Sequence, residues 1–260
     1  MERALARTNK KLENALKYRR HPAPNKKYKE PIVFVHFFDG SPALIKKHID
    51  LVNEFGFDAY SYQVSFHLTK RRPLDFLPHN NRLGLKNLWT IDLLNILKKI
   101  DGPKILYSFS NPASSAIEVT SKFFKEGSKE IKAIICDSGP FVDLFKCSRN
   151  LSTHYLKIKN PLANLSSSLF MTFGLSPNHS ANLHKDLASL PENFPILSIR
   201  GWKDELVPVK SIEKVFEPHK HIDLDTLILP EAGHLNGLKD FSSAYIPKVD
   251  LFLKKVATPL

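Results

Sequence analysis

Short apolar runs alternate with amphipathic segments along most of the chain. Continuous runs such as PIVFVH (residues 31–36) and KILYSF (residues 104–109) predict strands buried on both faces. The predicted strands are residues 31–36, 59–65, 104–109, 131–139, 195–201 and 225–233. The predicted helices are residues 41–56, 87–100, 113–127, 209–216 and 239–256. This alternation predicts an α/β fold, with a mainly parallel central sheet covered by helices on both faces.

Residues 141–194 interrupt this rhythm. Leucine and phenylalanine recur at helix-like spacing there, beginning with Phe141, Leu144 and Phe145. The stretch is too long for an ordinary loop. We therefore expect a small helical cap, inserted late in the chain after a strand.

Residues 1–30 differ from the rest in charge. They carry ten Lys or Arg and three Glu, a net charge of +7 out of +12 for the whole chain. We expect a basic N-terminal leader, a solvated helix packed loosely on a domain of residues 31–260. The alternative is attraction of the leader to an anionic membrane surface or an acidic partner. Nucleic acid is not an expected partner, because no aromatic residues are interleaved with the basic ones as a binding platform.

Composition narrows the class of protein. A chain of 260 residues with 42% hydrophobic residues has enough apolar material for a substantial core, which excludes global disorder. Its two cysteines, Cys136 and Cys147, make no disulfide framework, and no Cys/His cluster suggests a metal. No metal and no cofactor is expected. Neither a signal peptide nor a membrane-spanning run is evident, so we expect a cytoplasmic protein, with membrane association through the leader as the alternative.

Three chemically useful side chains follow predicted strands. Ser110 lies between strand 104–109 and the next helix, Asp204 follows strand 195–201, and His234 follows Gly233 at the end of the last strand. The carboxyl ends of parallel strands share one edge of the sheet, where ligand sites form. Rival residues are Ser114 and Ser115 for the serine, and Glu205 for the acid. His36 also ends a strand, at the first strand-to-helix loop.

These segments resemble the α/β-hydrolase superfamily, whose nucleophile turn reads Gly-x-Ser-x-Gly. Here the turn is Ser108-Phe109-Ser110-Asn111-Pro112, so both glycines are replaced. Ser108 is small, and Pro112 falls in the first helical turn, where a missing N–H costs little. The segments before Asp204 and around His234 resemble the acid and histidine loops of the superfamily. The resemblance implies an α/β-hydrolase fold with Ser110 as nucleophile, His234 as base and Asp204 as the acid.

The resemblance also implies an oxyanion hole. One N–H comes from Asn111, and the other from Phe38 in the loop VHFFDGS, where Phe37 replaces the usual glycine. An apolar cap above the serine suggests a hydrophobic substrate group. Phe37, Phe141 and Phe145 are the expected substrate contacts.

Together these features predict a serine hydrolase that cleaves a carboxylic ester through an acyl-enzyme, with a small-molecule ester or acyl substrate. A thioesterase or an acyltransferase with the same triad is an alternative. The glycine-poor turn and Phe37 motivate a further alternative, a catalytically silent binding protein with the same fold.

Overall fold

The sheet has seven strands among the residues described by the computed structural model, which are 18–37, 43–62, 82 and 84–260. Their order is β1-β3-β2-β4-β5-β6-β7, and every neighbouring pair is parallel except β1 and β3. The strands are β1 (Tyr18–His21), β2 (Ile32–Val35), β3 (Ala59–Tyr62), β4 (Lys104–Phe109), β5 (Ile131–Asp137), β6 (Pro195–Gly201) and β7 (Asp223–Leu229). The predicted α/β class with a mainly parallel sheet is confirmed.

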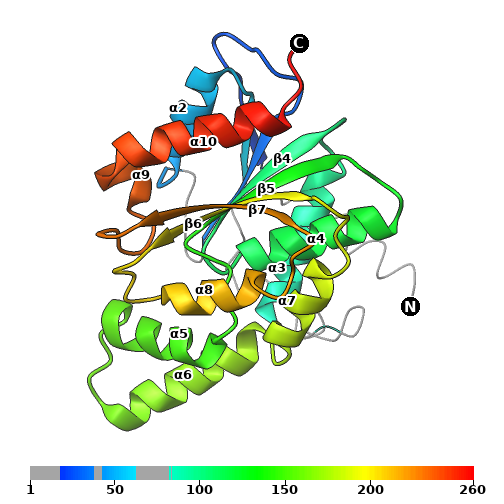
Figure 1. Cartoon of the computed structure of the whole chain (residues 1–260). Coiled ribbons are helices and arrows are strands. Elements are labelled where there is room, and N and C mark those ends of the chain that lie inside the picture. Colours follow the sequence, from blue (N-terminus) through cyan, green and yellow to red (C-terminus); the bar gives the residue numbers. More distant parts are fainter. Residues whose placement is uncertain (1–17, 38–42, 63–81, 83) are drawn as a thin grey trace.

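Helices cover both faces of the sheet (Figure 1). α2 and α10 lie on one face, and α3, α4 and α8 lie on the other. The helices are α2 (Lys46–Phe55), α3 (Leu85–Leu97), α4 (Ala113–Lys125), α5 (Leu144–Asn150), α6 (Pro161–Leu175), α7 (His179–Leu187), α8 (Val209–Phe216), α9 (Gly237–Asp240) and α10 (Ser242–Val256). A π-helix, η3 (Leu151–Tyr155), continues α5.

Each central strand contributes side chains to two separate cores. In β2, Val33 and Val35 join the cluster on the side of α3 and α4, whereas Ile32 and Phe34 join the cluster on the side of α2 and α10. This alternation is the ordinary geometry of a strand. Because both faces of the strand are buried, its sequence is apolar at every position, which is the pattern that predicted it.

Residues 18–30, which the sequence placed in a leader outside the domain, are part of the sheet region. β1 pairs antiparallel with β3, in a register that sets Tyr18 opposite Tyr62. Arg20 Nη2 lies 2.8 Å from Asp58 Oδ2, and the Ala23 N–H donates to Asp58 Oδ1 at 3.0 Å. β1 is an exposed edge strand of sequence YRRH, so it carries no apolar alternation that would have revealed it.

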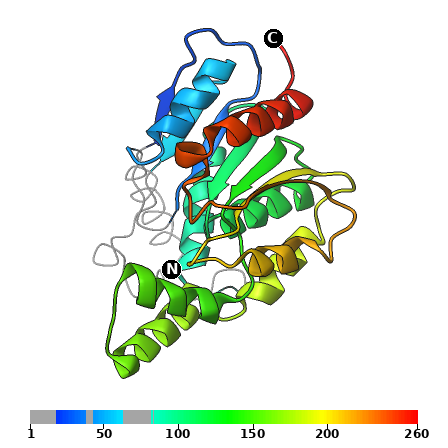
Figure 2. The ribbon, with the colours of Figure 1, turned by 60° about the vertical axis from the view of Figure 1, so that its left-hand side comes forward.

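The segment between β5 and β6 contains α5, η3, α6 and α7. α5, η3 and α6 form a hairpin, called here the cap hairpin (residues 144–175). It projects from the body at the end opposite α2 and α10, as both orientations of the ribbon show (Figures 1 and 2). No helix within the described residues is long and apolar enough to cross a membrane.

The strand order places a crevice beside β2. From β2 the chain moves to β3 on one side and later to β4 on the other, so the direction of winding reverses between β2 and β4. Open parallel sheets bind ligands at such a reversal, outside the carboxyl ends of the strands. Phe37 follows β2 and Ser110 follows β4, so these two residues flank the crevice.

Candidate active site

Ser110 stands in a strained turn between β4 and α4. Its φ angle is 52°, in the left-handed region that residues with a side chain seldom adopt. The Ser110 N–H donates to the carbonyl of Asp137 at 2.8 Å, and the Ser110 carbonyl accepts from the Ala113 N–H at 3.1 Å. Backbone hydrogen bonds to the end of β5 and to the first turn of α4 therefore fix this turn.

A glycine permits this turn, although no glycine flanks Ser110 in sequence. A Cβ atom added to Gly139 would lie 2.3 Å from the Ser110 carbonyl oxygen. Gly139 follows β5, the strand next to β4. The backbone of the serine turn thus occupies the space that a side chain at position 139 would need.

Asp204 and His234 form a hydrogen-bonded pair. Asp204 Oδ2 lies 2.7 Å from His234 Nδ1, and the carboxylate is almost fully buried. Its other oxygen, Oδ1, accepts from the Leu206 N–H at 2.9 Å and the Val207 N–H at 2.8 Å. With three donors the carboxylate is fixed in orientation, and it favours the tautomer in which His234 Nε2 is free to accept a proton.

Close backbone packing brings the acid loop and the histidine loop together. A Cβ atom at Gly201 would lie 2.5 Å from the carbonyl oxygens of both Ala232 and Gly233. The Lys203 N–H donates to the Ala232 carbonyl at 2.9 Å. Glycine at position 201 is therefore required for the approach of the loop that carries Asp204 to the loop that carries His234.

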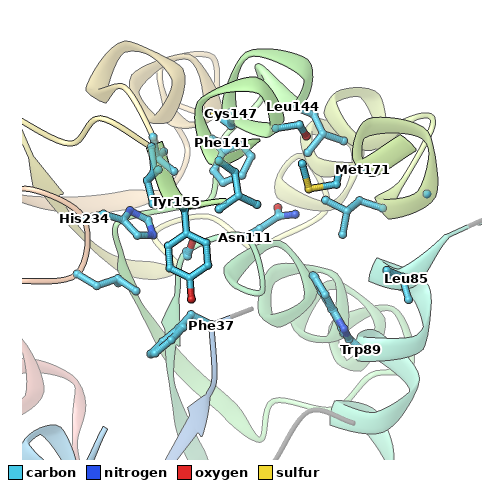
Figure 3. A pocket seen from close by; sticks show the side chains of 18 of the residues that line it. Phe37, Leu85, Trp89, Asn111, Phe141, Leu144, Cys147, Tyr155, Met171 and His234 are labelled. Carbon is cyan, nitrogen blue, oxygen red and sulfur yellow. The ribbon is translucent and has the colours of Figure 1, made fainter. Parts of the chain in front are cut away.

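Ser110 and His234 line the same cavity, which has a volume of about 480 Å³. Figure 3 shows His234 and Tyr155 on one side and Leu85 and Trp89 on the other, with Asn111 between them. The lining is mostly apolar, and its other members include Phe37, Phe141, Leu144, Cys147, Leu151, Phe170, Met171, Leu175, Leu206 and Val207. The polar groups of Ser110, Asn111 and His234 therefore face a hydrophobic chamber roofed by the cap hairpin.

No family model matches the chain, and no curated protein matches it. Solved structures do. An esterase from Pyrococcus furiosus is 17% identical, with a TM-score of 0.67 and coverage of 94% of this chain and 91% of that one. A monoacylglycerol lipase from Paleococcus ferrophilus is 15% identical, with a TM-score of 0.64 and coverage of 92% and 98%. A bromoperoxidase from Bacillus anthracis is 17% identical, with a TM-score of 0.62 and coverage of 92% and 95%.

The chain has the α/β-hydrolase fold. This confirms the resemblance inferred from the strand ends. The similar proteins carry different names, and their low identity to this chain supports the fold and not a particular reaction.

Within this α/β-hydrolase fold, Asp137 and Ser138 support the histidine loop, a role that the sequence did not reveal. The Ser138 hydroxyl donates to Asp137 Oδ1 at 2.9 Å and accepts from the Leu235 N–H at 3.1 Å. The Tyr245 hydroxyl donates to Asp137 Oδ2 at 2.5 Å and also contacts the Tyr107 hydroxyl. Burial raises the pKa of Asp137 to about 6, although these hydroxyl donors oppose the rise. Asp137 is the last residue of β5 and Ser138 follows it, so their position at a strand end was the available signal.

The remaining predicted site residues fall in different places. Asn111 and Phe141 line the cavity together with Phe37, whereas Phe145 on α5 is not among the lining residues. Phe38, the second predicted oxyanion donor, lies outside the described residues. The rival Ser114 is buried and donates to the Asn111 carbonyl at 2.8 Å. Ser115 is also buried, with its hydroxyl directed to the Lys86 carbonyl at 3.4 Å.

The rival acid Glu205 is three-quarters exposed and lies beside His154, with 3.5 Å between Oε2 and Nδ1. Both cysteines are free and buried. Among the described residues, no group of His, Cys, Asp or Glu side chains is arranged to hold a metal ion. Of the predicted catalytic residues and their rivals, the structure joins Asp204 to His234 and places Ser110 and His234 on one cavity.

Proposed function

We propose that the protein is a serine hydrolase that cleaves a carboxylic ester through an acyl-enzyme. Ser110 Oγ attacks the ester carbonyl while His234 Nε2 accepts its proton. Asp204 stabilises the imidazolium that forms. His234 then gives the proton to the departing alcohol, and a water molecule activated by the same imidazole releases the acid.

One observation carries this proposal. His234, whose Nδ1 lies 2.7 Å from Asp204 Oδ2, lines the same cavity as Ser110, and the backbone of Ser110 is held at a positive φ. Strain of this kind is concentrated at functional sites, because it persists only where the surroundings enforce it. The oxyanion donors in this proposal are the N–H groups of Asn111 and Phe38.

The apolar cavity supports an ester with a hydrophobic acyl group. A volume of about 480 Å³ suits a small-molecule ligand. Asn111 adds one polar point to the chamber, since neither atom of its buried amide has a hydrogen-bond partner among the described residues. Thioester hydrolysis and acyl transfer would use the same residues, so hydrolysis rates over matched ester and thioester chain-length series separate the three reactions.

Active-site labelling tests the proposal. A fluorophosphonate probe is expected to label the natural protein and the Ser115→Ala variant but not Ser110→Ala. Ser110 lines the cavity together with His234, whereas Ser115 is buried with its hydroxyl directed to the Lys86 carbonyl. An unlabelled natural protein that also fails to turn over p-nitrophenyl esters would reject the proposal and favour a silent binding protein.

The acid has its own test. In Asp204→Asn, Oδ1 still accepts from two backbone N–H groups, so the amide nitrogen must face His234 Nδ1. Two donors would then meet and the imidazole would adopt the wrong tautomer, so ester turnover should fall by about 10⁴-fold. Turnover of p-nitrophenyl acetate measures this, and near-normal turnover in Asp204→Asn would exclude Asp204 as the acid.

We also propose that residues 1–30 contact an anionic membrane surface. Residues 1–17 lie outside the described residues. In the part that is described, Arg20 and Lys26 lie 2.8 Å and 3.5 Å from the carboxylate of Asp58. Two cations of this segment are thus paired within the protein, and the proposal rests on the charge of the others.

A further inference from the structure

α6 packs with its polar face inward. Asn164 and Ser168 are buried against η3, where the Asn164 amide donates to Thr153 Oγ1 at 3.0 Å and Ser168 Oγ lies 3.4 Å from Ser152 Oγ. The Ser168 hydroxyl also donates to the Asn164 carbonyl at 2.7 Å. This is the reverse of the usual arrangement, in which the apolar stripe of a surface helix faces the core.

The opposite face of α6 is apolar and exposed. Leu162 is 76% exposed and Phe173 is 63% exposed. Other exposed apolar residues of the helix are Leu165, Leu169 and Phe170. Positions 162, 165, 169 and 173 recur at helical spacing, so they form one continuous stripe along the helix. A contiguous exposed apolar stripe of this kind marks an interaction surface.

The charge of the cap hairpin indicates what covers this stripe. Residues 144–175 contain four basic residues, Lys146, Arg149, Lys157 and Lys159, and no Asp or Glu. All four basic residues are exposed. Lys157 and Lys159 directly precede α6 and are followed by Leu162 at the start of its apolar stripe. An apolar helix face bordered by cations matches a membrane surface that contains anionic lipid.

The stripe is also continuous with the cavity. Phe170 of α6 and Tyr155 of η3 line the cavity, yet they are 75% and 59% exposed. They therefore stand at its mouth. A surface that covers α6 also meets this opening, so a ligand can pass between that surface and Ser110 without crossing bulk water.

We infer that the exposed apolar face of α6, with Lys157 and Lys159, docks on an anionic lipid surface and that the cavity receives its ester from that layer. The substrate part of this inference rests on the proposed ester hydrolysis, whereas the docking part does not. A second copy of the chain fits the surface less well, because it would bring an equally positive hairpin and would cover the mouth of the cavity.

Vesicle co-sedimentation of the full chain tests the docking. The natural protein should bind phosphatidylcholine vesicles that contain phosphatidylglycerol, bind pure phosphatidylcholine vesicles more weakly, and lose binding as salt rises. The double variants Leu162→Gln/Phe173→Gln and Lys157→Gln/Lys159→Gln should each weaken binding to the anionic vesicles by about tenfold or more. Leu251→Gln is the matched control, since Leu251 on α10 is 65% exposed and lies away from the cap hairpin.

Two further measurements separate docking from catalysis. Ser110→Ala should bind vesicles as the natural protein does, so the docking result stands even if the proposed reaction fails. The double variants should hydrolyse soluble p-nitrophenyl acetate normally, because none of the four changed residues lines the cavity, but should lose activity on a monoacylglycerol held in anionic vesicles.

Three outcomes would overturn the inference. The natural protein fails to bind the anionic vesicles, or the double variants bind them as tightly as Leu251→Gln does. The third outcome is that the natural protein sediments as a dimer and the Leu162→Gln/Phe173→Gln variant as a monomer. That result would assign the apolar stripe to contact with a second copy of the chain.

Discussion

At the scale of single residues, the serine turn depends on a neighbour that lies elsewhere in the sequence. Ser110 holds a φ of 52°, and its carbonyl fills the space above the Cα of Gly139. The usual glycines of this turn are replaced by Ser108 and Pro112, and both replacements are tolerated. Pro112 lies just before the first residue of α4, with φ −54°, a value that proline adopts without strain.

Replacing Gly139 with alanine should lower ester turnover by about 10²-fold, because the added methyl group forces the Ser110 backbone to move by an appreciable fraction of an ångström. Initial rates on p-nitrophenyl acetate measure the loss. Gly127→Ala is the control, since Gly127 also has a positive φ, of 81°, but has nothing within 4 Å of its added Cβ. That control should lose about 1 kcal/mol of stability and keep its turnover. Equal turnover in the two variants would contradict the proposed constraint.

The sequence pointed to Ser110, Asp204 and His234 because each lies in the loop that follows a strand, and that position is a local property. It missed the support of the histidine loop for a physical reason. Asp137 matters through its contact with Tyr245, which α10 brings from a distant part of the chain. Phe145 shows a second limit of local patterns. Helical spacing marked it as an apolar position of the cap, but spacing alone does not show which side of α5 faces the cavity.

At the scale of elements, a buried ion cluster joins three helices. Glu118 on α4 lies 2.7 Å from Lys86 on α3, 2.9 Å from Lys122 and 2.8 Å from Arg82. Arg82 in turn lies 2.7 Å from Asp186 on α7. Burial pushes the pKa of Glu118 upward, but the three cations outweigh it and hold the pKa at about 2.

Glu118→Gln should destabilise the fold by about 3–5 kcal/mol near neutral pH, because it leaves buried cations without their carboxylate. The folded pKa of about 2 lies below the ordinary value of 4.5, so the stabilisation by Glu118 is complete above about pH 4.5 and is lost as pH falls toward 2. Urea unfolding over a pH series should therefore show a flatter acid limb for the variant.

The exposed Glu126, just beyond α4, provides the control for that measurement. Glu126→Gln should change the free energy of unfolding by less than about 0.5 kcal/mol. If Glu118→Gln were no less stable than Glu126→Gln, the ion cluster would have no net role in holding α7 to the body.

Most elements were predictable because their patterns are strong and local. The bounds of β4, β6 and α8 agree with the sequence prediction, since each is a continuous apolar run or a clear amphipathic stripe between turn residues. β1 was not predictable in this way. Its residues are polar and exposed, and they become a strand only because β3 offers an unpaired edge.

At the scale of the whole molecule, residues 27–30 are tied to residues 258–260. The Lys29 N–H donates to the Thr258 carbonyl at 3.0 Å, and the Leu260 N–H donates to the Lys27 carbonyl at 2.9 Å. Tyr28 forms a bridge with Pro259 and stacks on Phe57. No local pattern announces contacts between segments so far apart in sequence, which is why the prediction of a loosely packed leader extended to residue 30.

A buried carboxylate lies at the centre of this junction, and it provides a test of the junction. Glu30 is 1% exposed, and its two oxygens accept from the Thr258 N–H and the Thr258 hydroxyl, both at 2.8 Å. Thr258→Val keeps the shape and the N–H but removes the hydroxyl, so one carboxylate oxygen loses its donor. We expect a loss of about 1–3 kcal/mol in the free energy of unfolding. Thr258→Ser keeps the hydroxyl and should lose less than about 1 kcal/mol, and urea unfolding of both variants measures the difference. Equal losses in the two variants would mean that the hydroxyl does not stabilise Glu30 and that the junction depends on its backbone hydrogen bonds alone.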